Sequence, residues 1–308
     1  MDTATEVKPE PENVMAVIEQ AKVEESPLAH RPTGENAIAI KAKTLREFLK
    51  QLAALQDEFI LEFEDWGVHA KIVDSAHVAM LDISMDKSAF LLYAVKGNPH
   101  IYIDIDDMLR WSKQAKEDDD IHMRFEPETY KNKNGDEYTE LRMRIAYRYF
   151  RYSKRVDFAD KQGIGEPKAP HLNLPVTFTI PRMFVVESLK AVGDLSDHIT
   201  IKTSEDGVDF CCNREDNGET LDCDIGKHFL DEFKEIPPSH EKEIDHRTKD
   251  FKYKSMFPCD YLENIMKAIK SEMVTLNVGN DYPIEIRSVW AGGRGKSMYL
   301  LAPRVESE

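Results

Sequence analysis

The sequence predicts an α+β protein made of two similar domains, each with helices packed on antiparallel sheet. A helical pattern that leads into an alternating strand pattern occurs four times, so the chain is internally repeated. Two copies end in matching turns, Asp65-Trp66-Gly67-Val68 and Glu205-Asp206-Gly207-Val208. A length of 308 residues is sufficient for two hydrophobic cores. The four helical patterns are Thr44–Leu52, Asp106–Ala115, Met183–Val192 and Asp260–Lys270.

The composition limits the classes of function. The net charge of −16 at pH 7 argues against a protein that coats nucleic acid with its whole surface, but it is compatible with a segregated basic patch. The four cysteines form no Cys-x-x-Cys pair and have no histidines at zinc-finger spacing, so we expect buried, reduced thiols. Because there is no signal peptide and no long apolar run, we expect a soluble cytoplasmic protein without membrane contact. We also expect no cofactor and no metal site.

The composition along the chain predicts four segments. Residues 1–35 are acidic and contain scattered prolines, which predicts a flexible extension without a core. Residues 36–152 form the first domain and residues 175–308 the second. Glycines and prolines within 153–174 indicate an interdomain connector. A polar insertion at 234–249 is expected to form an exposed loop of the second domain.

The first half of the first domain contains one strand, one helix and three further strands. The opening strand is predicted at Ala37–Ile40. The helix has Thr44 at its expected N-cap and Glu47 three residues later, which is the pattern of a capping box. The three strands that follow are predicted at Phe59–Phe63, Val68–Val73 and Val78–Met85.

The second half of this domain contains a helix and a hairpin. The helix is predicted to begin at Asp106 or Asp107, because acidic residues are favoured in the first turn. The sequence Lys133-Asn134-Gly135-Asp136 predicts a β-hairpin turn. The run from Leu141 to Tyr152 alternates arginine with apolar residues and is predicted to be one half-exposed strand.

A glycine-rich segment near the C-terminus resembles a phosphate-binding loop only in part. In Gly292-Gly293-Arg294-Gly295-Lys296-Ser297 the required first glycine is replaced by Trp290, and too little chain follows for the helix that such a loop begins. The flanking Val289–Ala291 and Met298–Leu301 instead predict a β-hairpin. A nucleotide-binding enzyme is therefore the least favoured function, and we expect no enzymatic activity.

Several motifs carry a resemblance to a known family. One is Asp74-Ser75-Ala76-His77-Val78 within Gly67–Leu81. The others are Asp281–Ile284, Ala291–Gly295 and Tyr299–Val305. Through them residues 36–305 resemble the DNA polymerase sliding clamps of the proliferating cell nuclear antigen (PCNA) family, most of all the archaeal members. The extension, the connector and the polar insertion depart from the compact family pattern.

The resemblance implies a ring of three subunits with pseudo-sixfold symmetry, built from two DNA-clamp domains per chain. Helices would line the hole and sheets would form the outer wall. Duplex DNA would pass through without sequence-specific contacts. DNA polymerase, the clamp loader, a flap nuclease and a ligase would dock through a short motif, so that the protein acts as a processivity factor in DNA replication and repair.

Basic residues on the helices are the expected DNA contacts. Residues three or four apart share a helix face, and a helix on a sheet exposes the face opposite to its buried one. Basic faces inside a ring would contact phosphates in a sequence-independent, salt-dependent way. The predicted DNA-facing residues are Arg46, Lys50, Arg110, Lys113, Arg182, Lys190, Lys267 and Lys270.

Two strands are predicted to lie at sheet edges and to join neighbouring subunits. One carries Arg142 and Arg144, and the other carries Asp222 and Asp224. Opposite charges would favour head-to-tail pairing. The predicted interface residues are Leu141, Arg142, Met143, Arg144, Ile145, Thr220, Leu221, Cys223 and Ile225.

Matching positions in the family imply a hydrophobic docking surface for the partner motif. The residues at these positions are His77, Val78, Met80, Tyr282, Pro283, Ala302, Pro303 and Arg304, with Val156 and Phe158 from the connector. One alternative stays open, a divergent clamp or heterotrimer subunit that acts as a scaffold with altered partner choice. The unusual connector and insertion favour it.

Overall fold

The computed structural model describes residues 36–131, 133–148, 150–156, 170, 172, 174–214, 218–235 and 253–304. The predicted extension lies outside the described residues, as do most of the predicted connector and most of the polar insertion. Within the described residues, no helix has the length and apolar character needed to cross a membrane.

The first half of the chain contains nine strands and two α-helices among its described residues. The strands are β1 (Ala37–Lys41), β2 (Glu58–Glu64), β3 (Gly67–Val73), β4 (Ala79–Asp86), β5 (Leu92–Ala94), β6 (His100–Asp104), β7 (Asp120–Lys131), β8 (Glu137–Tyr147) and β9 (Phe150–Val156). The helices are α2 (Ala42–Leu52) and α3 (Ile105–Ser112), and a 3-10 turn, η2, spans Lys87–Ala89.

The second half repeats this plan. Its strands are β10 (Val176–Pro181), β11 (His198–Thr203), β12 (Gly207–Asn213), β13 (Thr220–Gly226), β14 (Glu232–Glu235), β15 (Tyr253–Pro258), β16 (Met273–Val278), β17 (Ile284–Trp290) and β18 (Gly295–Leu301). Its helices are α4 (Arg182–Gly193) and α5 (Cys259–Ala268), with 3-10 turns η3 (Lys227–Phe229) and η4 (Ala291–Gly293).

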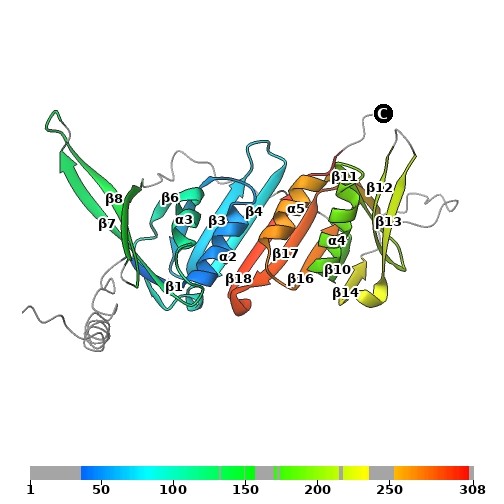
Figure 1. The fold of residues 1–308 in the computed structure, drawn as a ribbon, viewed down its shortest axis with the longest axis horizontal. Coiled ribbons are helices and arrows are strands. Elements are labelled where there is room, and N and C mark those ends of the chain that lie inside the picture. The colour runs from blue at the N-terminus through cyan, green and yellow to red at the C-terminus, as the bar shows by residue number, and fades with distance from the viewer. Residues whose placement is uncertain are drawn as a thin grey trace, which may run out of the picture.

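The described strands form three antiparallel sheets. A nine-stranded sheet, in the order β14-β10-β16-β17-β18-β4-β3-β2-β6, runs through the middle of the molecule. A five-stranded sheet, β5-β1-β7-β8-β9, and a four-stranded sheet, β13-β12-β11-β15, lie at its two ends (Figure 1). Strand β18 pairs with β4 from Gly295↔Met85 to Leu301↔Ala79, so the two halves share one continuous sheet.

The four helices lie on one face of the nine-stranded sheet in the spatial order α3, α2, α5, α4 (Figure 1). Helix α2 contacts α3, helix α4 contacts α5, and α2 and α5 meet where the halves join. The apolar face of α2 is buried as its periodicity predicts, with Leu45, Phe48, Leu49 and Leu52 in the core. The order of the helices therefore places their polar faces side by side on one surface.

The start of α2 differs from the prediction. The helix begins at Ala42, and its N-cap residue Lys41 makes no side-chain capping bond. The free amides of the first turn instead donate to the loop before β7, Ala42 to the Asp119 carbonyl at 2.9 Å and Lys43 to the Glu117 carbonyl at 3.1 Å. The capping box predicted from Thr44 and Glu47 is wrong because a tertiary contact satisfies these donors one turn earlier.

The start of α3 is close to the prediction. The helix begins at Ile105, and the Asp104 side chain accepts a hydrogen bond from the Asp107 amide at 3.0 Å. Asp106 and Asp107 lie in the first turn, where the helix dipole favours acidic residues. The N-cap is therefore an aspartate that precedes the two that the sequence indicated.

The predicted strand from Leu141 to Tyr152 is wrong, because the chain reverses within it. Arg148 has φ of 49°, a left-handed conformation that turns the chain between β8 and β9. Strand β9 then runs back along β8 to the pair Leu141↔Val156. Strand β8 therefore lies inside its sheet rather than at the edge, and residues 153–156 form a strand where a connector was predicted.

Two predicted turns are confirmed. Strands β7 and β8 pair as far as Lys131↔Glu137, so the turn around Asn134-Gly135 closes a long hairpin. Near the C-terminus, β17 and β18 flank η4, and Lys296 and Ser297 lie within β18. Since their backbone groups belong to a sheet and no helix follows among the described residues, this segment lacks the geometry of a phosphate-binding loop.

Candidate nucleic-acid interface and partner-docking surface

Each of the four helices exposes a stripe on the side away from the sheet. Six of the eight predicted DNA-facing residues have exposed side chains on these stripes or close to their ends. They are Lys50, Arg110, Lys113, Lys190, Lys267 and Lys270. Among the described residues Lys50, Lys113 and Lys190 form no ion pair, whereas Arg110 pairs with Asp107 and Lys267 with Glu263. Lys50, Lys113 and Lys190 are therefore the most available cations.

Arg46 does not belong to the exposed stripe. Its Nη1 donates to the carbonyl oxygens of Ser112 and Ala115, each at 2.8 Å, at the C-terminal end of α3. The Ser112 carbonyl also accepts a hydrogen bond from the Ala115 amide at 3.2 Å, and a positive charge at a helix C-terminus is favourable. Arg46 thus fastens α2 to α3.

Arg182 makes the equivalent contact in the second half. Its Nη1 donates to the Met266 carbonyl at 2.9 Å and its Nε to the Ser271 carbonyl at 3.2 Å, at the end of α5. The internal repeat thus extends to a pair of arginines that cap the neighbouring helix. Both guanidinium groups are engaged by backbone oxygens, so Arg46 and Arg182 have a structural contact that their predicted place in the DNA-facing set did not include.

The sequence prediction omitted one exposed basic residue of the helices. The exposed helix faces also carry acidic side chains. Lys43 is exposed in the first turn of α2. Burial raises the pKa of Glu47, and Lys43 and Lys270 oppose that shift. Lys270 follows α5 and Glu47 lies on α2, so charged side chains of the two helices interact across the junction between the two halves. Acidic side chains are also exposed on these helices, namely Asp106, Glu187 and Asp260.

The connection between β3 and β4 is a rigid turn built around Asp74. This buried carboxylate accepts hydrogen bonds from the amides of Ala79 at 2.7 Å, Val78 at 2.8 Å and Ala76 at 3.2 Å. The Tyr261 hydroxyl of α5 donates to it at 2.7 Å. Burial by itself would raise the pKa of Asp74, but these donors hold it below its ordinary value.

The turn presents part of the predicted docking surface. His77 is exposed with φ of 56°, Val78 is half-buried, and Met80 is buried in β4. The amide of Ala302 donates to the Val78 carbonyl at 2.9 Å, which fixes the segment after β18 beside the turn. Leu300 lies directly opposite Met80. Neither Leu300 nor Tyr261 was in the predicted set, although the alternation of β18 could have indicated Leu300.

The remaining docking residues lie at the same end of the sheet. Ile284 pairs with Leu301, so Tyr282 and Pro283 come just before the end of the ladder at which Ala302 and Pro303 leave it. Tyr282 is 47% exposed. Arg304 lies further away, where its amide donates to the Met256 carbonyl at 2.8 Å and its guanidinium contacts His198.

Val156 is separated from this surface. It is buried at the end of β9 and lines a cavity of about 200 Å³ together with Met108, Trp111 and Met143. This cavity lies between α3, β6 and β9, at the far end of the nine-stranded sheet. The structure therefore places Val156 in the core at the end of β9, apart from the other predicted docking residues, and Phe158 lies outside the described residues.

The predicted subunit-interface strands have different positions in their sheets. In β8, Leu141, Met143 and Ile145 are buried, and Arg142 and Arg144 pair with Glu128 and Glu126 of β7. An interior strand has no free backbone groups for another chain, so these five residues cannot form an edge. Strand β13, with Thr220, Leu221, Cys223 and Ile225, does lie at the edge of its sheet. In the first half, β9 lies at one edge of the five-stranded sheet and β5 at the other.

The chain is similar to known proteins over most of its length. Residues 36–134 match the family model for the N-terminal domain of proliferating cell nuclear antigen. The DNA polymerase sliding clamp of Methanocorpusculum labreanum is 27% identical over 271 residues, which cover 87% of this chain and 98% of that protein. The DNA polymerase sliding clamp of Archaeoglobus fulgidus is 26% identical over 274 residues, 88% of this chain and 99% of that protein.

Solved structures have the same fold. The structure of A. fulgidus PCNA with the bound C-terminal region of FEN-1 aligns with a TM-score of 0.72 at 24% identity, covering 88% of this chain and 99% of that one. PCNA from Thermococcus kodakaraensis aligns with a TM-score of 0.69 at 19% identity, covering 87% and 99%. Residues 36–134 thus match the PCNA family, and the chain has the fold of the archaeal PCNA structures and is similar over most of its length to archaeal DNA polymerase sliding clamps.

Proposed function

We propose that this protein is a sliding clamp that encircles duplex DNA and tethers DNA polymerase and other replication and repair proteins to it. The observation that carries the proposal is the row of four helices on one face of a continuous nine-stranded sheet, with exposed lysines along the row. One chain forms only an arc. Encirclement requires further copies, joined at the two ends of that arc.

The ends of the arc are complementary. Among the described strands, β9 at one end and β13 at the other lie at sheet edges, where backbone groups can pair with another chain. Alternate residues of β9 expose Arg151 and Arg155, and alternate residues of β13 expose Asp222 and Asp224. Pairing of β9 with the β13 of the next subunit would place these opposite charges on the same face. This head-to-tail contact is heterologous, so it generates a ring when the rotation closes.

The mixed charge on the helices suits a clamp that slides. Lys43, Lys50, Lys113 and Lys190 would meet phosphates without reading bases, and each contact would be weak and screened by salt. The exposed acids beside them limit the total attraction. A closed ring retains DNA by topology, so tight binding is not needed and would oppose sliding.

Partner proteins would dock at the end of the β17–β18–β4 ladder, around His77, Val78, Tyr282, Ala302 and Pro303. The partners we propose are DNA polymerase, a clamp loader, a flap nuclease and a ligase, each presenting a short motif. The protein itself has no catalytic role in this proposal, and it acts in the cytoplasm in association with the nucleoid. The two repeated halves, joined by the connector after β9, are its two clamp domains.

Two measurements test the proposal. Light scattering at two salt concentrations should give a mass near three times 35.4 kDa, and a monomer at low salt would contradict a self-sufficient ring. Protein loaded on a nicked circular plasmid should remain bound in high salt and be released when the plasmid is linearised. Equal release from both DNA forms would show surface adhesion instead of encirclement. A monomer that forms a ring only with a second chain would favour the heterotrimer alternative.

A further inference from the structure

We propose that Glu62, Glu64 and His100 form a binding site for a divalent transition-metal cation on the outer face of the nine-stranded sheet. One oxygen of each carboxylate and a ring nitrogen of His100 lie within 4.8 Å of one another. A cation placed between these three atoms would have three protein ligands at once. This site is separate from the DNA-facing and docking surfaces and does not depend on the proposed function.

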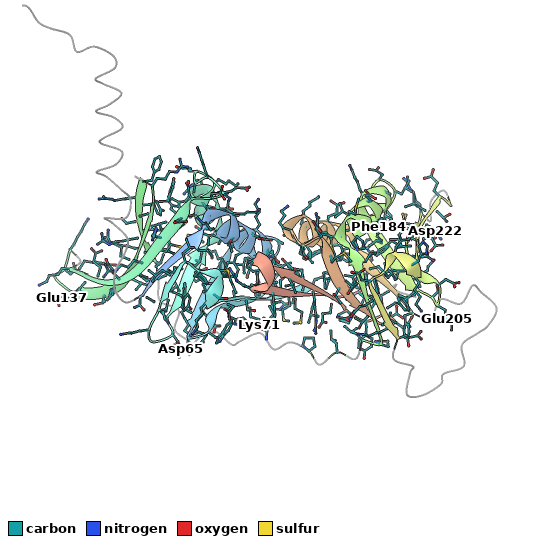
Figure 2. All side chains as sticks on the ribbon, turned by 90° about the horizontal axis from the view of Figure 1, so that it is seen from below. Asp65, Lys71, Glu137, Phe184, Glu205 and Asp222 are labelled. Atoms are coloured by element: carbon teal, nitrogen blue, oxygen red, sulfur yellow. The ribbon has the colours of Figure 1, made fainter. Side chains whose placement is uncertain are left out.

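The sheet register brings the three side chains together. Glu62 and Glu64 are two residues apart in β2, so they point to the same face. His100 of β6 lies directly opposite Glu62. Because Phe63 between them is buried in the core, the two carboxylates point away from the helices. In Figure 2, Lys71 of the neighbouring strand β3 lies on that same side of the sheet, opposite to the helices.

His100 supports a ligand role because it is buried without a hydrogen bond. Its side chain is only 10% exposed, and that of Glu62 is 18% exposed. The closest approach of the ring is 3.8 Å, from its Nδ1 to Glu62 Oε2, which is beyond hydrogen-bonding distance. Among the described residues the His100 ring makes no other polar contact. A nearly buried imidazole that points at two carboxylates without bonding them leaves room for an ion between.

The surrounding charges also favour a cation. Among the described residues no lysine or arginine forms an ion pair with Glu62 or Glu64, so their like charges are not offset. His69 lies opposite Glu62 on its other side, but its Nε2 bonds Asp82 at 3.0 Å. Asn98 donates from Nδ2 to Glu64 Oε2 at 2.6 Å, which leaves the second oxygen of Glu64 available. A hydrogen bond from a neighbouring side chain to a ligating carboxylate orients that carboxylate toward the metal.

The ligand set selects the class of metal. Imidazole suits Zn²⁺ and its transition-metal neighbours, whereas Mg²⁺ and Ca²⁺ prefer oxygen ligands alone. One histidine and two glutamates leave at least one coordination position for water in a tetrahedral Zn²⁺ site. The bound ion would link β2 to β6, the strand at the edge of the sheet, and would stabilise the pairing of these two strands.

The test uses the full chain without a histidine tag, freed of metal by a chelator, with Zn²⁺ as the probe. Calorimetry should show one site per chain, and His100→Gln and Glu62→Gln should each weaken it at least tenfold. His228→Gln changes an exposed histidine outside the cluster, and Glu58→Gln an exposed carboxylate of the same strand. Both control variants should bind as the wild type does.

Two further readouts keep the test decisive. Bound Co²⁺ should give visible absorption without thiolate charge-transfer bands, which excludes binding at the cysteines. If Glu62→Gln or His100→Gln fails to fold by circular dichroism, Glu64→Gln replaces it, since Glu64 ends its strand. Unchanged Zn²⁺ affinity in a folded cluster variant, or no saturable binding by the wild type, would overturn the proposal.

Discussion

The hydroxyl of Tyr299 donates a hydrogen bond of 3.0 Å to the backbone carbonyl of Gln51, and both residues are completely buried. Tyr299 lies in β18, the last strand, and Gln51 in α2, the first helix of the chain's described part. Phe48 of the same helix packs on Trp290 of β17, with ring centroids 5.8 Å apart. The first helix therefore closes a core that the last strands complete, and the halves are expected to unfold together.

Replacing Tyr299 with phenylalanine tests this junction. The change removes the donor and keeps the ring, so the Gln51 carbonyl retains only a long bond of 3.4 Å from the Ala54 amide. We expect a decrease of about 1 to 2 kcal/mol in the free energy of unfolding, measured by urea denaturation, with a single transition preserved. Tyr282→Phe, at an exposed ring, should leave it within about 0.5 kcal/mol. Two separate transitions in the wild type would contradict a shared core.

The bond between Tyr261 and Asp74 is predicted to depend on pH. The pKa of Asp74 is held below its ordinary value, so its contribution to stability is present above about pH 4 and is lost as the pH falls through the folded pKa. The hydrogen bond to Asp74, together with burial, raises the pKa of Tyr261 to about 12. The hydroxyl therefore remains a donor at neutral pH.

The variant Tyr261→Phe should lower the free energy of unfolding by about 1 to 2 kcal/mol at pH 7, and by less at a pH where Asp74 is protonated. It should also weaken the binding of a partner-motif peptide, because the turn that carries His77 and Val78 loses one of its supports. Thermal unfolding between pH 3 and pH 8 and peptide titration at pH 7 measure both effects. A difference that is constant with pH would show that the charge of Asp74 is not involved.

The repeated pattern, the four helices and most strands could be predicted because each depends on local periodicity. The errors arose where distant residues decide the structure. Thr44 has good capping chemistry, but the loop at 117–119 supplies the partners one turn earlier. The alternation from Leu141 to Tyr152 continues through Arg148, and only its left-handed backbone reveals the turn.

The candidate site shows the same limit. Periodicity places Arg46 and Arg182 on helix surfaces, but it does not show that a neighbouring helix ends within reach of each guanidinium. Likewise Glu62 and His100 are remote in sequence, and only the β2–β6 register sets them face to face. Motif matching located the turn at His77 and the segment at Ala302 because those residues are contiguous within their motifs.

The arginines and lysines of the helices should separate into two classes. Arg182→Gln removes the donors to the end of α5 and should cost about 1 to 2 kcal/mol of stability, because backbone oxygens lose their partners. Lys50→Ala and Lys190→Ala should change stability by less than about 0.5 kcal/mol. They should instead weaken the association of the protein with duplex DNA and reduce its salt dependence, by roughly 0.9 in logarithmic slope for each phosphate that is no longer neutralised. Urea denaturation and fluorescence anisotropy over a salt series measure the two properties.

The last prediction concerns the edge strands. The like charges of Asp209 in β12 and Asp224 in the edge strand β13 face each other across the β12–β13 ladder. Burial raises the pKa of Asp209, and the neighbouring Asp224 raises it further. This edge is therefore under electrostatic strain in a single chain, and a basic strand from another subunit would relieve it. Lys154 is already engaged by Asp107 and Asp104 of its own chain. Arg151 and Arg155 are exposed and are the proposed partners, with the Arg155 guanidinium resting over the Tyr130 ring, 4.0 Å from its centroid.

Charge reversal of Arg151 and Arg155 to glutamate should therefore convert the oligomer into monomers at moderate salt. Reversal of Asp222 and Asp224 to lysine should do the same, and a mixture of the two variants should associate again because the reversed edges are complementary. Light scattering of each variant and of the mixture measures the outcome. Arg142→Glu and Arg144→Glu are the matched controls, because these arginines lie in the interior strand and pair within their own sheet. Dissociation by the control variants but not by the β9 variants would place the interface elsewhere than on the free edges.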